Sequence, residues 1–118
     1  MTEFYEQVKE RLMRYARINT ESDPHSTSVP TTFCQHDLAS VIYEELQEIG
    51  ATNVYYDKDT CVVYGSLEAN VKTGRAIGFV THMDTAPDAS GKDVKPWVLE
   101  NYDGKDIVLN AEKKALHQ

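Results

Sequence analysis

The chain has 118 residues, of which 41% are hydrophobic and 26% are charged. These values are typical of one small folded domain with a single core, and they exclude a disordered or fibrous protein. The formal charge of −7 and the pI near 5.0 argue against a nucleic-acid-binding surface, because such surfaces gather Lys and Arg on one face.

Cysteine usage and hydropathy bear on location. Cys34 and Cys61 lie far apart without a CxxC spacing, so we expect two buried reduced thiols and neither a zinc knuckle nor a redox pair. No stretch approaches the roughly 20 apolar residues of a membrane span, and the opening MTEFYEQVKE lacks a signal-peptide core. We therefore expect a cytoplasmic protein with no membrane partner.

Two helices are predicted in the first 50 residues. The first is amphipathic and ends near Arg17, with Thr2 as its N-cap; its apolar positions are Phe4, Val8, Leu12 and Tyr15. A loop rich in Ser, Thr and Pro follows at residues 20–32. The second helix is predicted over residues 32–49, with Gly50 in the position of a C-terminal glycine; its apolar stripe is Leu38, Val41, Ile42, Leu46 and Ile49.

Short strand-like segments occupy the rest of the chain. NVYYD (residues 53–57) and CVVYGSL (61–67) flank a DKDT turn, and RAIGFVTH (75–82) follows a turn that contains Asn70 and Gly74. Because Ala76, Ile77, Phe79 and Val80 are nearly continuous, we expect residues 75–82 to be an interior strand covered on both faces.

A β-hairpin is predicted over residues 97–110, because WVLENY and KDIVLN flank the turn dipeptide Asp103-Gly104. Residues 111–118, AEKKALHQ, show neither a helix nor a strand pattern. The predicted fold is α/β: two helices packed on a mixed β-sheet, with a C-terminal β-hairpin.

The segment FVTHMDTAPD carries the strongest chemical signal. In an extended backbone residues i and i+2 point the same way, so His82 and Asp84 are expected to project together. One imidazole nitrogen can bind a metal ion while the other donates to a carboxylate. An HxD pair alone also fits a capped turn with a local hydrogen bond, and Asp88, which follows Pro87, is predicted to form a turn.

The sequence resembles the peptidase T family of tripeptide aminopeptidases, which are co-catalytic zinc exopeptidases. The resemblance covers nearly all of residues 1–110 and rests on four stretches: the region of Tyr15, Ile18, Thr20 and Ser22, the segment IGFVTHMDTAPD, the loop SGKDVKP, and NYDGKDIVLN. Residues 111–118 depart from the family pattern. The resemblance implies that residues 1–118 are an incomplete N-terminal segment of such a catalytic domain.

The resemblance also implies roles for two residues. His82 matches the histidine that binds one of two zinc ions, and Asp84 matches a catalytic aspartate that orients it. In the family, the zinc ions polarise the scissile amide of a short peptide, and a glutamate moves the proton of the attacking water. That glutamate and the other metal ligands lie beyond the matching segment in the full-length enzymes. We therefore expect the chain alone to bind zinc weakly at one site and to be inactive toward tripeptides.

The remaining histidines have no role that the resemblance implies. His25 and His36 are expected to be structural or exposed, and His117 lies in the divergent tail. An HxD metallophosphoesterase is disfavoured, because no further His or Asp ligand cluster is present. A non-catalytic module of the same fold, which binds a partner or forms a homo-oligomer through exposed sheet edges, is the alternative function.

Overall fold

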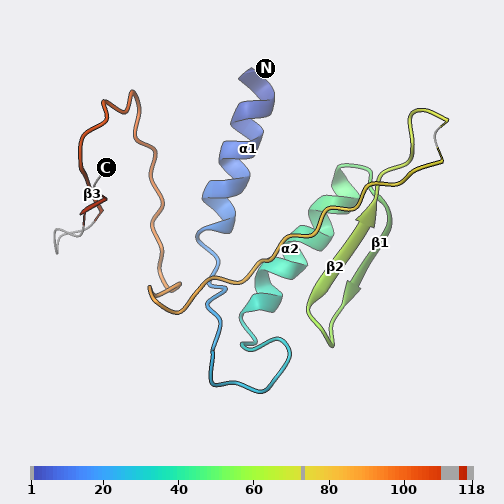
Figure 1. Ribbon diagram of the computed structural model, residues 1–118, viewed down its shortest axis with the longest axis horizontal. Helices are drawn as coiled ribbons and strands as arrows, with labels where there is room; N and C mark the ends of the chain where they lie inside the picture. The colour runs from blue at the N-terminus through green and yellow to red at the C-terminus, as the bar shows by residue number, and fades with distance from the viewer. Residues whose placement is uncertain (1, 73, 110–114, 117–118) are drawn as a thin grey trace.

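The computed structural model describes residues 2–72, 74–109 and 115–116 (Figure 1). Two helices come first, α1 (Thr2–Tyr15) and α2 (Gln35–Glu48). Four strands follow: β1 (Thr52–Asp57), β2 (Val62–Ser66), β3 (Ile107–Val108) and β4 (Ala115–Leu116). This order confirms the α/β class. The strands of the described residues form two antiparallel pairs, β1 with β2 and β3 with β4, in place of the expected mixed sheet.

The best-packed part of the molecule is α2 against the β1–β2 hairpin. Leu38 and Ala39 of α2 are buried. Gly65 of β2 permits close approach, since a Cβ there would lie 3.2 Å from Leu46 Cδ1. The predicted C-terminal glycine of α2 is confirmed: Gly50 has φ +82°, and its N–H donates to the carbonyl of Gln47 at 3.0 Å.

The β1–β2 hairpin and its turn were also predicted. Tyr55 pairs with Tyr64 across the strands, and their rings stack with centroids 6.2 Å apart. In the turn the Asp57 carboxylate accepts the N–H groups of Asp59 at 3.0 Å and Thr60 at 3.4 Å. Hydrogen bonds from Thr60 and Asp59 lower the pKa of Asp57.

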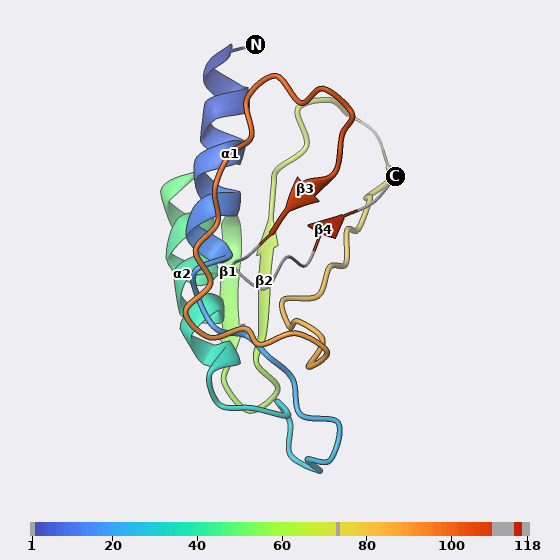
Figure 2. The same cartoon turned by 90° about the vertical axis from the view of Figure 1, so that its left-hand side faces the viewer.

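Helix α1 is present as predicted, but its apolar stripe is not covered. Phe4, Val8 and Leu12 are exposed. The contacts between the two helices lie near the C-terminal end of α1. They involve Glu45 of α2, which accepts a hydrogen bond from the Tyr15 hydroxyl and forms an ion pair with Arg14. Figure 2 shows the first turns of α1 standing beyond the end of α2.

The prediction of an interior strand at residues 75–82 was wrong. Residues 75–82 belong to no strand, and Ile77, Phe79 and Val80 are 83%, 93% and 101% exposed. An interior strand needs a hydrogen-bonded neighbour at each edge, and within the described residues no strand pairs with this segment. Figure 2 shows residues 74–82 returning past the hairpin without joining it.

The predicted hairpin over residues 97–110 was wrong in its first strand. Its turn does form: Gly104 has φ +81°, and the N–H of Lys105 donates to Asp103 Oδ1 at 3.2 Å. Residues 97–102 form no strand, however, and β3 pairs with β4 instead. The two residues of β4 are too few to show an alternating pattern, which is why residues 111–118 gave no strand signal. Residue 110 lies outside the described residues.

Candidate functional site

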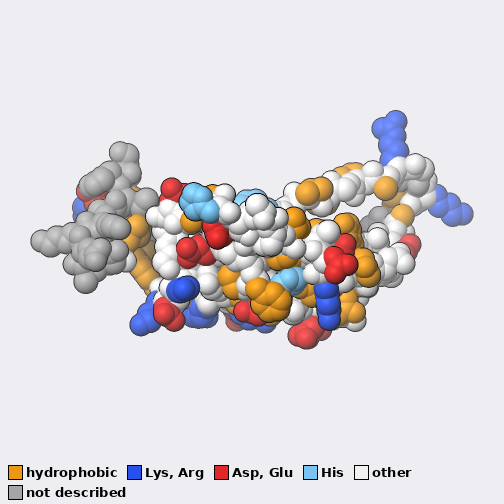
Figure 3. Space-filling model, turned by 90° about the horizontal axis from the view of Figure 1, so that it is seen from below, with side chains coloured by type: hydrophobic (Ala, Val, Ile, Leu, Met, Phe, Trp, Pro, Cys, Tyr) orange, Lys and Arg blue, Asp and Glu red, His pale blue; other side chains and the backbone are white. Residues whose placement is uncertain are grey.

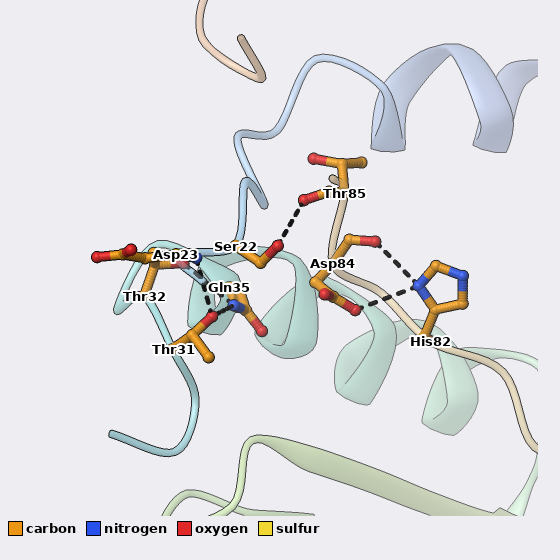
Figure 4. Close-up of polar contacts among 8 residues, drawn as sticks. All are labelled: Ser22, Asp23, Thr31, Thr32, Gln35, His82, Asp84 and Thr85. Atoms are coloured by element: carbon orange, nitrogen blue, oxygen red, sulfur yellow. Dashed lines mark hydrogen bonds and ion pairs between the residues drawn. The ribbon is translucent and has the colours of Figure 1, made fainter. Parts of the chain in front are cut away.

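His82 and Asp84 contact each other directly (Figure 4). His82 Nδ1 lies 3.2 Å from Asp84 Oδ1 and 3.0 Å from the Asp84 carbonyl oxygen. The His82 side chain is 85% exposed and that of Asp84 is 42% exposed. The predicted contact between the carboxylate and the imidazole is confirmed, although it forms in an extended segment and not at the end of a strand.

This geometry fixes the proton on the imidazole. Both partners of Nδ1 are oxygen acceptors, so Nδ1 carries the hydrogen and donates it. In a neutral ring the lone pair then resides on Nε2 of His82, whose side chain is exposed to solvent. A histidine ligand held in one tautomer by a carboxylate has this arrangement, and the carboxylate raises the basicity of the ligand nitrogen. His82 is thus suited to bind a metal ion through Nε2, with Asp84 as the group that orients its ring.

A short backbone bridge fixes the chain immediately after Asp84. The N–H of Thr85 donates to the carbonyl of Thr20 at 3.0 Å, and the N–H of Ser22 donates to the carbonyl of Thr85 at 2.9 Å. The Ser22 hydroxyl adds a third hydrogen bond, to the same Thr85 oxygen at 3.0 Å. Together they make an isolated parallel bridge between Glu21 and Thr85. The motif is therefore fastened to the loop between the two helices.

Glu21 holds the far end of the loop that follows the motif. Its Oε2 accepts the N–H of Gly91 at 2.9 Å and lies 3.5 Å from the Ser90 hydroxyl. A side chain at Gly91 would force a neighbouring group to move, since a Cβ there would lie 2.6 Å from Asn19 Oδ1. We call the contacts of Glu21 with Thr85 and Gly91 the Glu21 clip; it ties both ends of residues 85–91 to one point.

The clip is connected to the start of α2. The Thr32 hydroxyl donates to the Glu21 carbonyl at 2.7 Å, and Gln35 Nε2 donates to the hydroxyls of Thr31 and Thr32, each at 3.1 Å. Gln35 is buried, so its amide is held in place (Figure 4). Sequence reasoning assigned this stretch to a loop and missed its positioning role, because contacts between residues so far apart leave no local pattern.

The other candidate ligands stay apart from the pair. His25 is exposed and its backbone N–H donates to the Asp23 carboxylate, while His36 shares a hydrogen bond with the Tyr56 hydroxyl. Asp88 is exposed in a turn, as expected. The part of the chain that the structure describes holds no cluster of three or more His, Cys, Asp or Glu side chains able to bind a metal ion. His117 lies outside the described residues.

The two cysteines are free thiols. Cys61 is buried and Cys34 is half-buried, so the expectation of two buried thiols holds fully only for Cys61. Burial raises the pKa of the Cys61 thiol, which keeps it protonated at neutral pH. Burial also raises the pKa of the neighbouring Tyr56. The buried Cys61 thiol is therefore a poor nucleophile at neutral pH.

Comparison with known proteins finds relatives of one family. It is 47% identical over 110 residues to peptidase T of Alkaliphilus oremlandii, which aligns with 91% of the chain. It is 43% identical over 110 residues to peptidase T of Fusobacterium nucleatum and 46% identical over 109 residues to that of Geobacillus kaustophilus, each over 92% of the chain. The chain matches the N-terminal segment of peptidase T.

The chain spans about a quarter of the length of these peptidase T relatives, 27% of the first and 26% of the other two. No family model matches the chain. The family is one of peptidases, which are hydrolases. None of the helices in the described ranges has the length and apolar character that crossing a membrane requires.

Proposed function

We propose that this chain is the N-terminal portion of a zinc-dependent peptidase T that removes the first residue of tripeptides. The observation that carries the proposal is the identity of 43–47% to peptidase T over more than nine tenths of the chain. In this proposal residues 1–118 are one incomplete part of a catalytic domain, and short peptides are the substrates.

His82 supplies the metal ligand and Asp84 is the catalytic aspartate that orients it. The hydrogen bond of 3.2 Å from Nδ1 to Asp84 supports these roles, because it leaves Nε2 available to the metal. Bound zinc would polarise the scissile carbonyl and lower the pKa of a bound water. The chain's own contribution is to hold the imidazole in one tautomer and orientation.

The chain alone is proposed to bind zinc weakly, at a single site, and to be inactive. A catalytic zinc site commonly uses three protein ligands and an open position for water, whereas here the pair supplies one. Among the described residues, no group of three or more His, Cys, Asp or Glu side chains could hold a metal ion. The general base, which is typically worth about 10²–10⁴-fold in rate, is expected from the part of the relatives that the chain does not match.

The proposal also places the chain in the cytoplasm. Cys34 and Cys61 are both free in the structure. Free thiols fit a reducing compartment, where disulfides are rare.

A chimera tests the proposed function. This chain replaces the matching quarter of Geobacillus kaustophilus peptidase T, to which it is 46% identical. Tripeptide hydrolysis by the chimera is then measured in the presence of zinc. We expect the chimera to hydrolyse tripeptides, His82→Ala to abolish turnover, and the control His25→Ala to retain it. The unmodified chain assayed alone is expected to show none. Full activity of the His82→Ala chimera, or turnover by the isolated chain that His82→Ala removes, would contradict the proposal.

A further inference from the structure

The peptide unit between Asp84 and Thr85 is hydrogen-bonded at both ends. Its carbonyl oxygen, which belongs to Asp84, accepts a hydrogen bond from His82 Nδ1 at 3.0 Å. Its N–H, which belongs to Thr85, donates to the Thr20 carbonyl at 3.0 Å. A trans peptide unit is planar, so its C=O and N–H point in opposite directions and turn together. The direction of the Thr85 N–H therefore fixes the direction of the oxygen that the His82 ring contacts.

Ser22 makes two of the three hydrogen bonds that hold Thr85. Its backbone N–H and its hydroxyl both donate to the Thr85 carbonyl, at 2.9 Å and 3.0 Å. Thr85 is thus held at its N–H by Thr20 and at its C=O by Ser22, and it cannot turn without losing at least one of these bonds. Most residues at position 22 would offer the N–H, but the second donor requires a hydroxyl side chain.

The segment that holds Thr85 is itself fixed by other contacts. Thr20 is 3% exposed. The Thr32 hydroxyl donates to the Glu21 carbonyl at 2.7 Å, and the Glu21 carboxylate accepts the Gly91 N–H at 2.9 Å. Residues 20–22 are therefore the anchored side of the bridge, and the peptide unit of Asp84 and Thr85 is the side that they hold.

The His82 ring takes its orientation from Asp84. Among the described residues, the polar contacts of the ring are with the Asp84 carbonyl oxygen and with Asp84 Oδ1. Figure 3 views the molecule from the side of the loop between the helices and shows histidine side chains at separate points of the surface. A contact that fixes the backbone of Asp84 therefore also fixes the ring of His82.

We propose that Ser22 is a positioning residue for His82. It holds Thr85, the peptide unit carries this constraint to the Asp84 carbonyl, and that carbonyl keeps the hydrogen of the ring on Nδ1. With the hydrogen on Nε2 instead, Nδ1 would face two oxygen acceptors and Nε2 would have no lone pair for a metal ion. The inference rests on the proposed function, in which His82 is the zinc ligand. Ser22 acts through Asp84 and contributes no ligand of its own.

NMR of the metal-free chain, with a matched control, tests the proposal. Two quantities are measured: the tautomers of the neutral His82 ring, from its ¹⁵N shifts, and the hydrogen exchange of the Thr85 N–H. Ser22→Ala is expected to raise both the share of the Nε2–H tautomer and the exchange rate about two- to tenfold, the effect of one neutral hydrogen bond. Ser22→Thr keeps a hydroxyl and is expected to restore both. Ser28→Ala is the control, because it removes a serine hydroxyl of the same loop that donates to the Pro30 carbonyl at 2.8 Å; it is expected to change neither.

The two readouts separate a positioning role from a structural one. Faster exchange of Thr85 in Ser22→Ala with unchanged His82 tautomers would show that Ser22 only holds the loop, and it would overturn the proposal. Unchanged exchange and tautomers, or an equal change in Ser28→Ala, would overturn it as well. Neither readout uses metal or substrate. A chimera with no tripeptide hydrolysis would therefore contradict the proposed function and leave the outcome of this test unaffected.

Discussion

Replacing Gly91 by alanine tests whether the Glu21 clip holds the loop behind the candidate site. The added Cβ would lie 2.6 Å from Asn19 Oδ1, closer than atoms of this kind approach, so a group must move. If Asn19 rotates away, its hydrogen bond of 3.1 Å from the Glu21 N–H is lost. If the loop moves instead, the hydrogen bond of 2.9 Å from the Gly91 N–H to the Glu21 carboxylate is lost.

The two routes set the size of the effect. A neutral hydrogen bond contributes about 0.5–1.5 kcal/mol and one to a charged group about 1.5–3 kcal/mol. We therefore expect the clip to lose roughly 1–3 kcal/mol, which corresponds to a five- to 150-fold rise in the opening of its hydrogen bonds.

Amide hydrogen exchange reads this opening at the backbone bridge. The N–H groups of Ser22 and Thr85 donate within the bridge, and their protection is expected to fall in Gly91→Ala by that factor. Gly74→Ala is the matched control, because its Cβ meets nothing within 4 Å. If both variants keep the protection of the unmodified chain at Ser22 and Thr85, the clip does not hold the loop and the reasoning is refuted.

Three further predictions concern stability, measured as the free energy of unfolding in denaturant. Leu38→Ala is expected to cost about 2–5 kcal/mol because Leu38 is buried. Leu12→Ala, at a residue that is 66% exposed, is expected to cost less than about 1 kcal/mol, and equal costs would contradict the core assignment. Glu45→Gln is expected to cost roughly 1 kcal/mol and to reduce helicity, because Glu45 joins Tyr15 and Arg14 of α1 to α2; unchanged circular dichroism and stability would refute that role. The raised pKa of Cys61 gives stability that is present below the unfolded value of about 8.5 and is lost as pH rises through the folded value. Cys61→Ala should flatten this decline above about pH 8.5, and an unaltered decline would exclude the thiol as its source.

Elements with local causes could be predicted from the sequence. The stripe that includes Leu38 and Leu46, with Gly50 at its end, predicted α2, and the Asp57 turn between two β-branched and aromatic runs predicted the hairpin. The contact of His82 with Asp84 was predictable for the same reason, since two residues of separation in an extended chain place both side chains together.

Features that depend on distant partners were not predictable. The apolar run at residues 76–80 predicts an interior strand, yet burial requires neighbouring strands, and the described residues supply none. The Glu21 clip joins residues far apart in the chain through one carboxylate and two backbone groups, so neither periodicity nor composition indicated it. The composition of its loop predicted only an irregular segment.

The most direct test of the central claim is a zinc titration of the ¹⁵N-labelled chain, in which NMR follows both ring nitrogens of every histidine. The account predicts that zinc shifts Nε2 of His82 while its Nδ1 keeps the proton donated to Asp84, and that His25 and His36 respond only at higher zinc. Asp84→Asn should weaken the response of His82 about 10–100-fold, as expected on loss of a ligand's orienting carboxylate. Zinc binding through Nδ1 of His82, or a response at His25 or His36 that precedes any at His82, would contradict the account.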